Sequence, residues 1–221
     1  HCDIFAVEVF PLLHLFYKVL RSDIVAIIVQ KYGGSSVGTV EKIKAIAKTV
    51  TDRKNSGDSM VVVVSAMGDT TDELIDIANK VTSSPDKREL DALLSTGEMR
   101  SAALLAMAIK SLGCDSVSYT AYQINIKTSG QFGKSLIDDI NVDKIKKSLD
   151  EGKIVIAAGF QGINEDGDIT TLGRGGSDTT AVAIAVKLNG LCEIYTDVDG
   201  IYSVDPREHK DASKLYEIDY E

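Results

Sequence analysis

Two short glycine-rich segments carry charged side chains that could hold an anionic ligand. The first, 31–36, reads KYGGSS, and the second, 172–180, reads LGRGGSDTT. Adjacent glycines let a backbone approach a ligand closely, and a helix that follows directs free N–H groups and its positive dipole end at the same place. Lys31 adds a mobile charge, and Arg174 adds a planar fork suited to a carboxylate or a phosphate. We expect the two segments to surround one anionic ligand.

Each segment also has an ordinary structural interpretation. The first could be a strand-to-helix turn with a solvated lysine, and Asp178 could be the N-cap of the next helix. We favour ligand binding for the second segment, because a capping aspartate does not need an arginine and two glycines before it. Neither segment matches a Walker A loop, G-x-x-x-x-G-K-[ST], or a G-x-G-x-x-G dinucleotide fingerprint, which excludes both of those site types.

Three other places could contribute polar groups. Segment 65–71, SAMGDTT, brings hydroxyls to a predicted helix start, although ordinary capping explains it equally well. Segment 196–207, TDVDGIYSVDPR, could offer carboxylates to a metal or a ribose, Tyr202 to a base and Arg207 to a phosphate, or it could be a solvated turn. From the residues alone, Glu98 is expected on a solvated helix face.

Composition narrows the chemistry further. The 24 basic and 33 acidic residues give a net charge of −9, which repels polyanions and argues against nucleic-acid or anionic-membrane partners. Three dispersed cysteines predict a reduced, cytoplasmic setting and no zinc or disulfide framework. The three histidines are equally dispersed. Carboxylates, lysines and glycines must therefore carry the chemistry.

The elements that position these residues alternate between strand and helix. Apolar runs predict strands near 25–32, 60–64, 116–125, 153–158 and 191–195. Helical spacing predicts helices from 40, from 70 with a capping box of Thr70 and Glu73, over 87–112 with a polar break at 95–98, near 142–150 and over 180–188. Such alternation indicates a mostly parallel sheet covered on both faces, with ligands beyond the carboxyl ends of its strands.

Residues 1–24 differ from the rest. Their apolar part, 4–20, is interrupted by Glu8, Pro11, His14 and Lys18, so it is a poor membrane span, and it lacks the features of a signal peptide. We expect an extension outside the core of the fold. The alternative is an amphipathic helix that docks on a partner.

From about Val25 to its end, the chain resembles the catalytic domain of the aspartate kinases, members of the amino acid kinase superfamily. The segments that carry the resemblance, in the family's order, are KYGGSSV, VVVVSAMGDTTD, LLSTGEMRSA, GRGGSDTTA and YTDVDGIYSVDPR. The resemblance implies a three-layer αβα sandwich over 25–221, cut before a last nucleotide-pocket segment and before the regulatory ACT domains. It also implies ATP-dependent phosphorylation of the side-chain carboxylate of L-aspartate to 4-phospho-L-aspartate, the first step toward lysine, threonine and methionine.

The resemblance implies roles for named residues as well. Lys31 would be catalytic, with Asp178 as the acidic partner that orients it. The substrate-binding residues would be Thr71, Glu98, Arg174, Gly175, Gly176 and Ser177. The ATP-binding residues would be Lys31, Tyr32, Gly33, Gly34, Ser35, Ser65, Thr196, Asp197, Tyr202, Asp205 and Arg207. Mg²⁺ would be carried by the ATP phosphates, because it retains several waters and takes few protein ligands.

Two rival functions stay open at this point. One is a catalytically silent fragment that binds an amino acid or a nucleotide, and the other is a sister amino acid kinase with another substrate. For the full-length protein we expect a homodimer.

Overall fold

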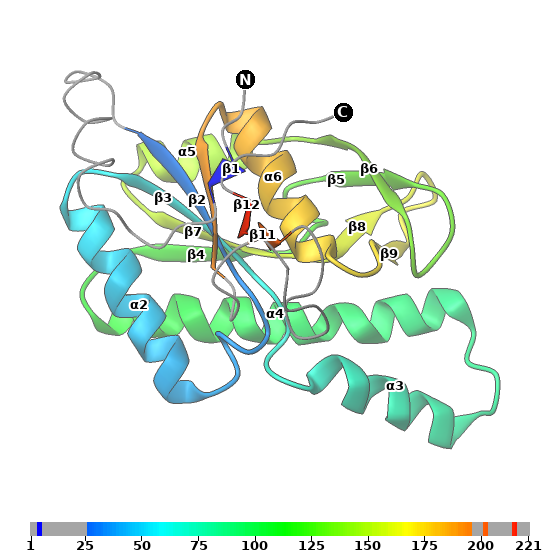
Figure 1. The fold of residues 1–221 in the computed structure, drawn as a ribbon. Helices are drawn as coiled ribbons and strands as arrows, with labels where there is room; N and C mark the ends of the chain where they lie inside the picture. The colour runs from blue at the N-terminus through cyan, green and yellow to red at the C-terminus, as the bar shows by residue number, and fades with distance from the viewer. Residues whose placement is uncertain (1–3, 6–25, 196–200, 203–213, 216–221) are drawn as a thin grey trace.

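The computed structural model describes residues 4–5, 26–195, 201–202 and 214–215. Its main sheet has six strands, and every neighbouring pair is parallel (Figure 1). In spatial order they are β1 (Ile4–Phe5), β10 (Leu191–Tyr195), β2 (Ile27–Tyr32), β3 (Ser59–Val64), β7 (Ile154–Ala158) and β4 (Ser116–Tyr119). The predicted parallel sheet is confirmed. Apart from β1, the expected extension 1–24 lies outside the described residues.

Helices cover both faces of this sheet, as predicted (Figure 1). On one face lie α2 (Val40–Asn55) and α4 (Lys87–Ser111), and α3 (Thr70–Val81) packs against α4. On the other face lie α5 (Asp143–Asp150) and α6 (Gly176–Leu188). The result is the three-layer αβα sandwich expected from the sequence.

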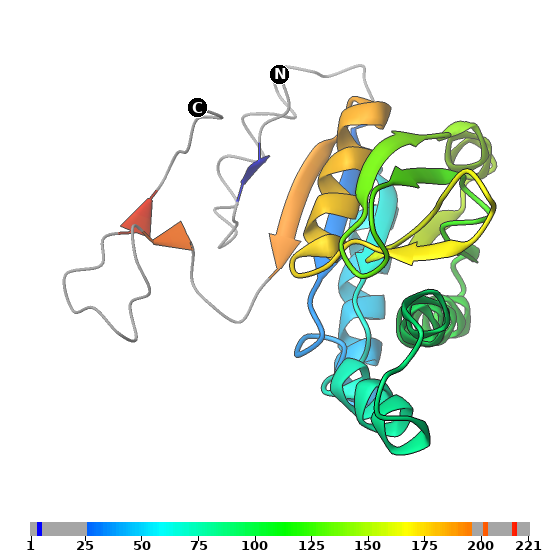
Figure 2. The same cartoon turned by 90° about the vertical axis from the view of Figure 1, so that its right-hand side faces the viewer.

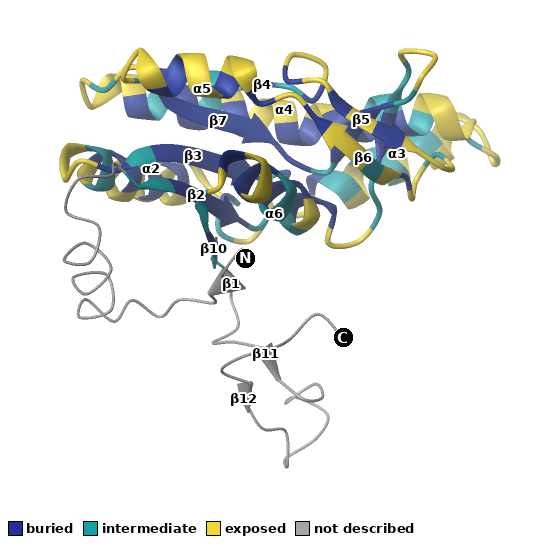
Figure 3. Ribbon diagram, turned by 90° about the horizontal axis from the view of Figure 1, so that it is seen from above, coloured by how far each residue is buried: buried dark blue, intermediate teal, exposed yellow. Residues whose placement is uncertain are grey.

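The sheet supplies the core of the molecule, and Figure 3 shows its strands buried between exposed outer helix faces. All the side chains of 61–64 in β3 are fully buried. Val61 and Val63 pack with α5 and α6, whereas Val62 and Val64 pack with α2 and α4. A strand with apolar neighbours on both faces has no polar side, which explains the unbroken valine run.

A second sheet of four strands lies beside α6 (Figure 2) and was not predicted. Its order is β6 (Leu136–Ile140), β5 (Ile126–Ser129), β8 (Gln161–Ile163) and β9 (Ile169–Thr171). The β5–β8 pair is parallel and the other two pairs are antiparallel. Since β9 ends where the second glycine segment begins, this sheet fixes the root of that segment. A further pair, β11 (Ile201–Tyr202) and β12 (Lys214–Leu215), is antiparallel.

The predicted capping box at the start of α3 is wrong. The N-cap residue is Asp69, and Thr70 already belongs to the helix. The Thr70 hydroxyl donates to the carbonyl of Met67 at 2.5 Å, so it does not cap the free N–H groups.

The predicted polar break in α4 is also wrong, because the helix runs through 95–98 without interruption. The hydroxyls of Ser95 and Thr96 donate to carbonyls of the preceding helical turn, which satisfies them inside the helix. Among the described residues, α4 alone is long and apolar enough to span a membrane, but half of its most apolar window is buried inside the molecule, as in the core helix of a soluble protein.

One predicted strand and one predicted helix have other boundaries in the structure. The strand expected over 116–125 ends at Tyr119, and a turn with Asn125 in the left-handed region follows. The helix expected over 180–188 begins at Gly176, and it is buried on one side only, since Val186 is 55% exposed.

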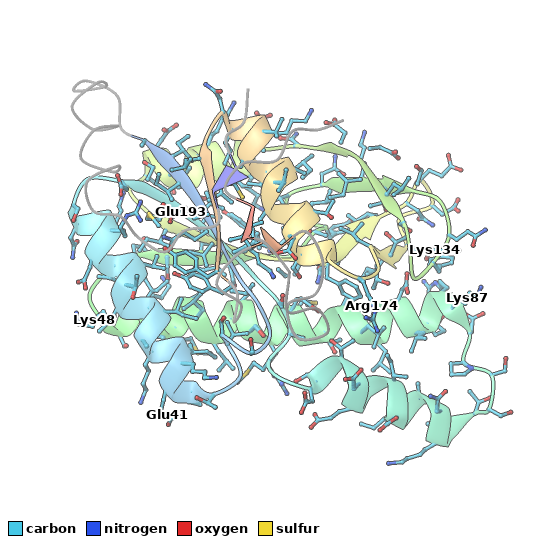
Figure 4. The ribbon with its side chains drawn as sticks, in the orientation of Figure 1. Glu41, Lys48, Lys87, Lys134, Arg174 and Glu193 are labelled. Atoms are coloured by element: carbon cyan, nitrogen blue, oxygen red, sulfur yellow. The ribbon has the colours of Figure 1, made fainter. Side chains whose placement is uncertain are left out.

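A buried polar network ties α2 to the sheet. The Arg53 guanidinium donates to Asp58 at 2.9 Å and to Glu193 at 3.2 Å, and Gln30 donates to Glu193 at 2.7 Å. Both carboxylates are nearly inaccessible to solvent. Figure 4 labels Glu193, which lies in β10.

Arg53→Met is expected to lower the free energy of unfolding by roughly 3 kcal/mol, because it removes the cation that two buried carboxylates share. Urea denaturation measures this loss. Lys110→Met is the control, because it breaks an exposed pair with Asp115 and should change little. Equal losses in the two variants would contradict the importance of the network.

Candidate functional site

Several loops meet at the carboxyl edge of the main sheet. Because β2, β3 and β7 are parallel, the segments that follow them, 33–36, 65–68 and 159–160, lie at the same edge. The first turn of α6 joins them there. This edge is where ligands bind in open α/β sheets.

An ion pair connects β2 to α6 at this edge. The Lys31 ammonium lies 2.8 Å from Oδ1 of Asp178, and the Lys31 side chain is only 10% exposed. The contact is an ion pair without hydrogen-bond alignment. A Cβ added at Gly33 would lie 3.5 Å from the same ammonium, so the charge sits beside the first glycine turn. The N-cap of α6 is Gly175, with φ 73°, and not Asp178.

The first glycine turn packs tightly against the loop after β3. A Cβ at Gly34 would lie 2.9 Å from the carbonyl oxygen of Ala66, so a larger residue would push the loops apart. The Gly34 carbonyl also accepts from the Gly68 N–H at 3.0 Å. Ser65 is held in turn, since its N–H donates to the Tyr32 carbonyl at 3.1 Å. The first glycine turn, 33–36, and the loop after β3, 65–68, therefore form one continuous surface.

Glu98 belongs to the same surface, and its placement on a solvated helix face is wrong. The side chain is 3% exposed, and Oε1 accepts from the Ala66 N–H at 3.1 Å. Gly97 makes this contact possible, because a Cβ there would lie 2.8 Å from the Ala66 Cβ. Burial raises the pKa of Glu98 to about 7. Oε2 is buried as well, and it accepts no hydrogen bond from any described residue.

The second glycine segment wraps around the start of α6. Gly173 and Gly175 both have positive φ, which favours glycine, and they flank the exposed Arg174 (Figure 4). Ser177 packs against Gly159, where an added Cβ would lie 2.7 Å from the serine Oγ. Gly176 is equally confined, since a Cβ there would lie 2.8 Å from the Leu172 Cβ. The segment is thus anchored on both sides of the arginine.

The structure therefore brings most of the described predicted residues to one edge. Contacts link Lys31, Gly33, Gly34, Ser65, Glu98, Gly176, Ser177 and Asp178 directly or through one neighbour.

Other predicted residues stand apart from this connected set. Thr71 is half-buried in the first turn of α3, and Ser35 follows Gly34 in the exposed part of the turn, its carbonyl accepting from Lys42. Tyr32 points into the core, where its hydroxyl donates to Gln30 and its ring stacks on Tyr195, so its side chain does not contribute to the site.

Part of the predicted nucleotide site lies outside the described residues. This applies to Thr196, Asp197, Asp205 and Arg207. Tyr202 is placed in β11 by its backbone only.

Sequence reasoning missed several contributors. Gly97, Gly159 and the Ala66 N–H act through close contacts between distant segments. Phe160, with φ 69°, turns the chain after β7 while its N–H donates to the Thr180 hydroxyl. Phe160 directly follows a buried strand and a glycine, and this sequence pattern could have identified it.

This fold is that of an α/β protein in which two glycine turns and the Lys31–Asp178 ion pair lie at the carboxyl edge of a parallel sheet. The model of the amino acid kinase family matches residues 26–221, and the chain belongs to that family.

Within the family, the chain is similar to aspartokinases. It is 55% identical over 196 residues to the aspartokinase of Bacillus sp. (strain MGA3), covering 88% of this chain and 48% of the relative. The aspartate kinase structure from Synechocystis matches with a TM-score of 0.71 and 47% identity, over 85% of this chain and 31% of that one. The structure of E. coli aspartokinase III in complex with aspartate and ADP matches with a TM-score of 0.74 and 25% identity, over 86% of this chain and 53% of that one. The chain spans about half the length of the curated relatives it matches.

Glu98→Gln is expected to gain stability relative to the unchanged chain as the pH rises. A carboxyl whose pKa is raised on folding contributes fully at low pH and loses that contribution as the pH passes the folded-state value. The difference in the free energy of unfolding should grow between about pH 4.5 and pH 7, to a size on the order of 3 kcal/mol. Urea denaturation at several pH values measures it, and a difference independent of pH would show that burial does not perturb Glu98.

Proposed function

We propose that this chain forms the catalytic part of an aspartate kinase, which transfers the γ-phosphoryl group of ATP to the side-chain carboxylate of L-aspartate. The observation that carries the proposal is the Lys31–Asp178 ion pair beside the glycine turn. Similarity to aspartokinases, one of them solved with aspartate and ADP, supports this choice of substrates.

The chemistry requires little of the protein beyond charge and position. The attacking carboxylate is already ionised at neutral pH, so no general base is needed. Phosphoryl transfer needs neutralisation of the charge on the transferred group and in-line placement of the reactants. Lys31 would supply the positive charge, and Asp178 would hold its ammonium in place from the first turn of α6. The N–H groups of 33–35 would complete the cradle.

The amino-acid substrate would lie between the Arg174 loop and α4. Arg174 would grip the α-carboxylate with its planar fork. The unpaired Oε2 of Glu98 would accept from the substrate ammonium, which would favour the ionised form of a carboxyl whose pKa burial raises to about 7. Thr71, at the start of α3, would hold a remaining polar group.

The nucleotide would extend from the first glycine turn toward Ser65 and segment 196–207. Mg²⁺, bound with the phosphates, would neutralise their charge during transfer. The described residues contain no cluster of three His, Cys, Asp or Glu side chains able to hold a metal ion, and an ion coordinated largely by phosphates and water does not require one. A role in lysine, threonine and methionine synthesis, a cytoplasmic location and a homodimer of the full-length protein stay part of the proposal.

Lys31→Ala and Asp178→Ala are each expected to lower kcat by roughly a hundredfold or more, because the transferred group loses its oriented positive charge. An aspartate hydroxamate assay with ATP and Mg²⁺ measures the rate. Lys48→Ala is the matched control, since it breaks the exposed Lys48–Asp52 pair on α2 and should leave the rate unchanged.

Full activity in the Lys31 and Asp178 variants would overturn the mechanism. No activity in the unchanged chain would favour the silent-fragment alternative, and faster phosphorylation of glutamate or UMP would favour a sister kinase.

Arg174→Lys is expected to raise the KM for aspartate by roughly tenfold with little change in the KM for ATP, because a point charge cannot replace a two-pronged fork. Steady-state kinetics with each substrate varied tests this. The control is Arg88→Lys, at an exposed arginine paired with Asp168 and Glu89. An unchanged KM for aspartate would remove Arg174 from the substrate site.

A further inference from the structure

Asp91 is a buried carboxylate that the proposed reaction does not use. It lies in α4, two turns before Glu98, and it is 1% exposed. It forms no ion pair with any described residue, yet three donors point at it. Oδ2 accepts from the N–H groups of Gly133 at 2.9 Å and Thr171 at 2.7 Å, and Oδ1 accepts from the Thr171 hydroxyl at 2.9 Å.

These donors come from two loops that reach the site from different strands. Gly133 lies in the turn between β5 and β6, and Thr171 is the last residue of β9, where the loop 172–175 that carries Arg174 begins. The loops also touch each other: the Ser135 N–H donates to the Thr171 carbonyl at 2.9 Å, and a Cβ at Gly173 would lie 3.2 Å from the Gly133 carbonyl oxygen. Asp91 therefore joins both loops to α4.

Arg174 stands close to this junction. It follows Thr171 by three residues, through Gly173, whose positive φ turns the chain. Figure 4 labels Arg174 on the loop before α6 and Lys134 on the turn beside it. An exposed arginine on a glycine-rich loop loses much freedom when it binds a substrate, unless the root of the loop is already fixed. Hydrogen bonds to a charged acceptor are the strong ones, so Asp91 is well suited to fix it.

We propose that Asp91 is a positioning residue: it fixes the Gly133 turn and the root of the Arg174 loop against α4, and so sets the affinity for the amino-acid substrate without touching it. The part that concerns affinity rests on the proposed function. The part that concerns the loop does not.

Asp91→Ala and Asp91→Asn form the kinetic test. Alanine removes all three acceptor contacts, and the KM for aspartate should rise roughly tenfold or more, with the KM for ATP within about twofold of its original value. Asparagine can keep the geometry, because its carbonyl can accept both N–H groups while the Thr171 hydroxyl rotates to accept from its amide. Asp91→Asn should therefore stay within a few fold of the unchanged protein.

Two results would overturn the proposal. One is an unchanged KM for aspartate in Asp91→Ala, and the other is an equal rise in both KM values, which indicates a general structural role. If Asp91→Ala does not fold, Thr171→Val replaces it, since valine keeps the shape and removes one donor. A rise of a few fold in the KM for aspartate is then expected, and no rise would contradict the proposal.

Hydrogen exchange tests the loop itself and needs no activity. In Asp91→Ala, or in Thr171→Val if it replaces it, amides of 133 and 171–176 should exchange faster, with the protection of β3 unchanged. Faster exchange at 133 and 171 alone would show that Asp91 does not hold the Arg174 loop. Because this readout is independent of catalysis, failure of the proposed function and failure of the positioning role can be told apart.

Discussion

The site depends on the ion pair between Lys31 and Asp178. A lysine near the end of a buried strand needs an anionic partner, because an unpaired ammonium in such a place is costly. Asp178 meets it from the first turn of α6, where the helix dipole also favours a carboxylate. The pair fixes the approach of α6 to β2, and it leaves one face of the ammonium beside Gly33.

Small residues set the remaining distances around that pair. A side chain at Gly34 would separate the first turn from Ala66, one at Gly97 would lift α4 from the same residue, and one at Gly159 would displace Ser177. Without these contacts Glu98 could not reach the Ala66 N–H, and the start of α6 could not pack against Gly159, the residue after β7. Close packing between backbone segments therefore shapes the site. It brings the charged side chains of Lys31, Asp178 and Glu98 to one edge of the sheet.

The parallel sheet, its flanking helices and the two glycine turns could be predicted from the sequence, because runs of apolar residues and adjacent glycines are local patterns. The second sheet escaped prediction because strands as short as Gln161–Ile163 and Ile169–Thr171 carry no usable period. Glu98 was misplaced because its burial comes from Ala66, a residue distant in sequence, fitting against Gly97. Asp91 shows no local signal either, since its three donors come from two separate loops.

A double-mutant cycle tests the central claim most directly, namely that Asp178 acts through Lys31. The kcat of aspartate phosphorylation would be measured for the unchanged protein, for Lys31→Ala, for Asp178→Ala and for the double variant. If the two side chains work as one unit, the double variant should lose no more than Lys31→Ala alone, so that the coupling energy equals the cost of the Asp178 change. Losses that multiply would mean that the two groups act independently, and would contradict the account.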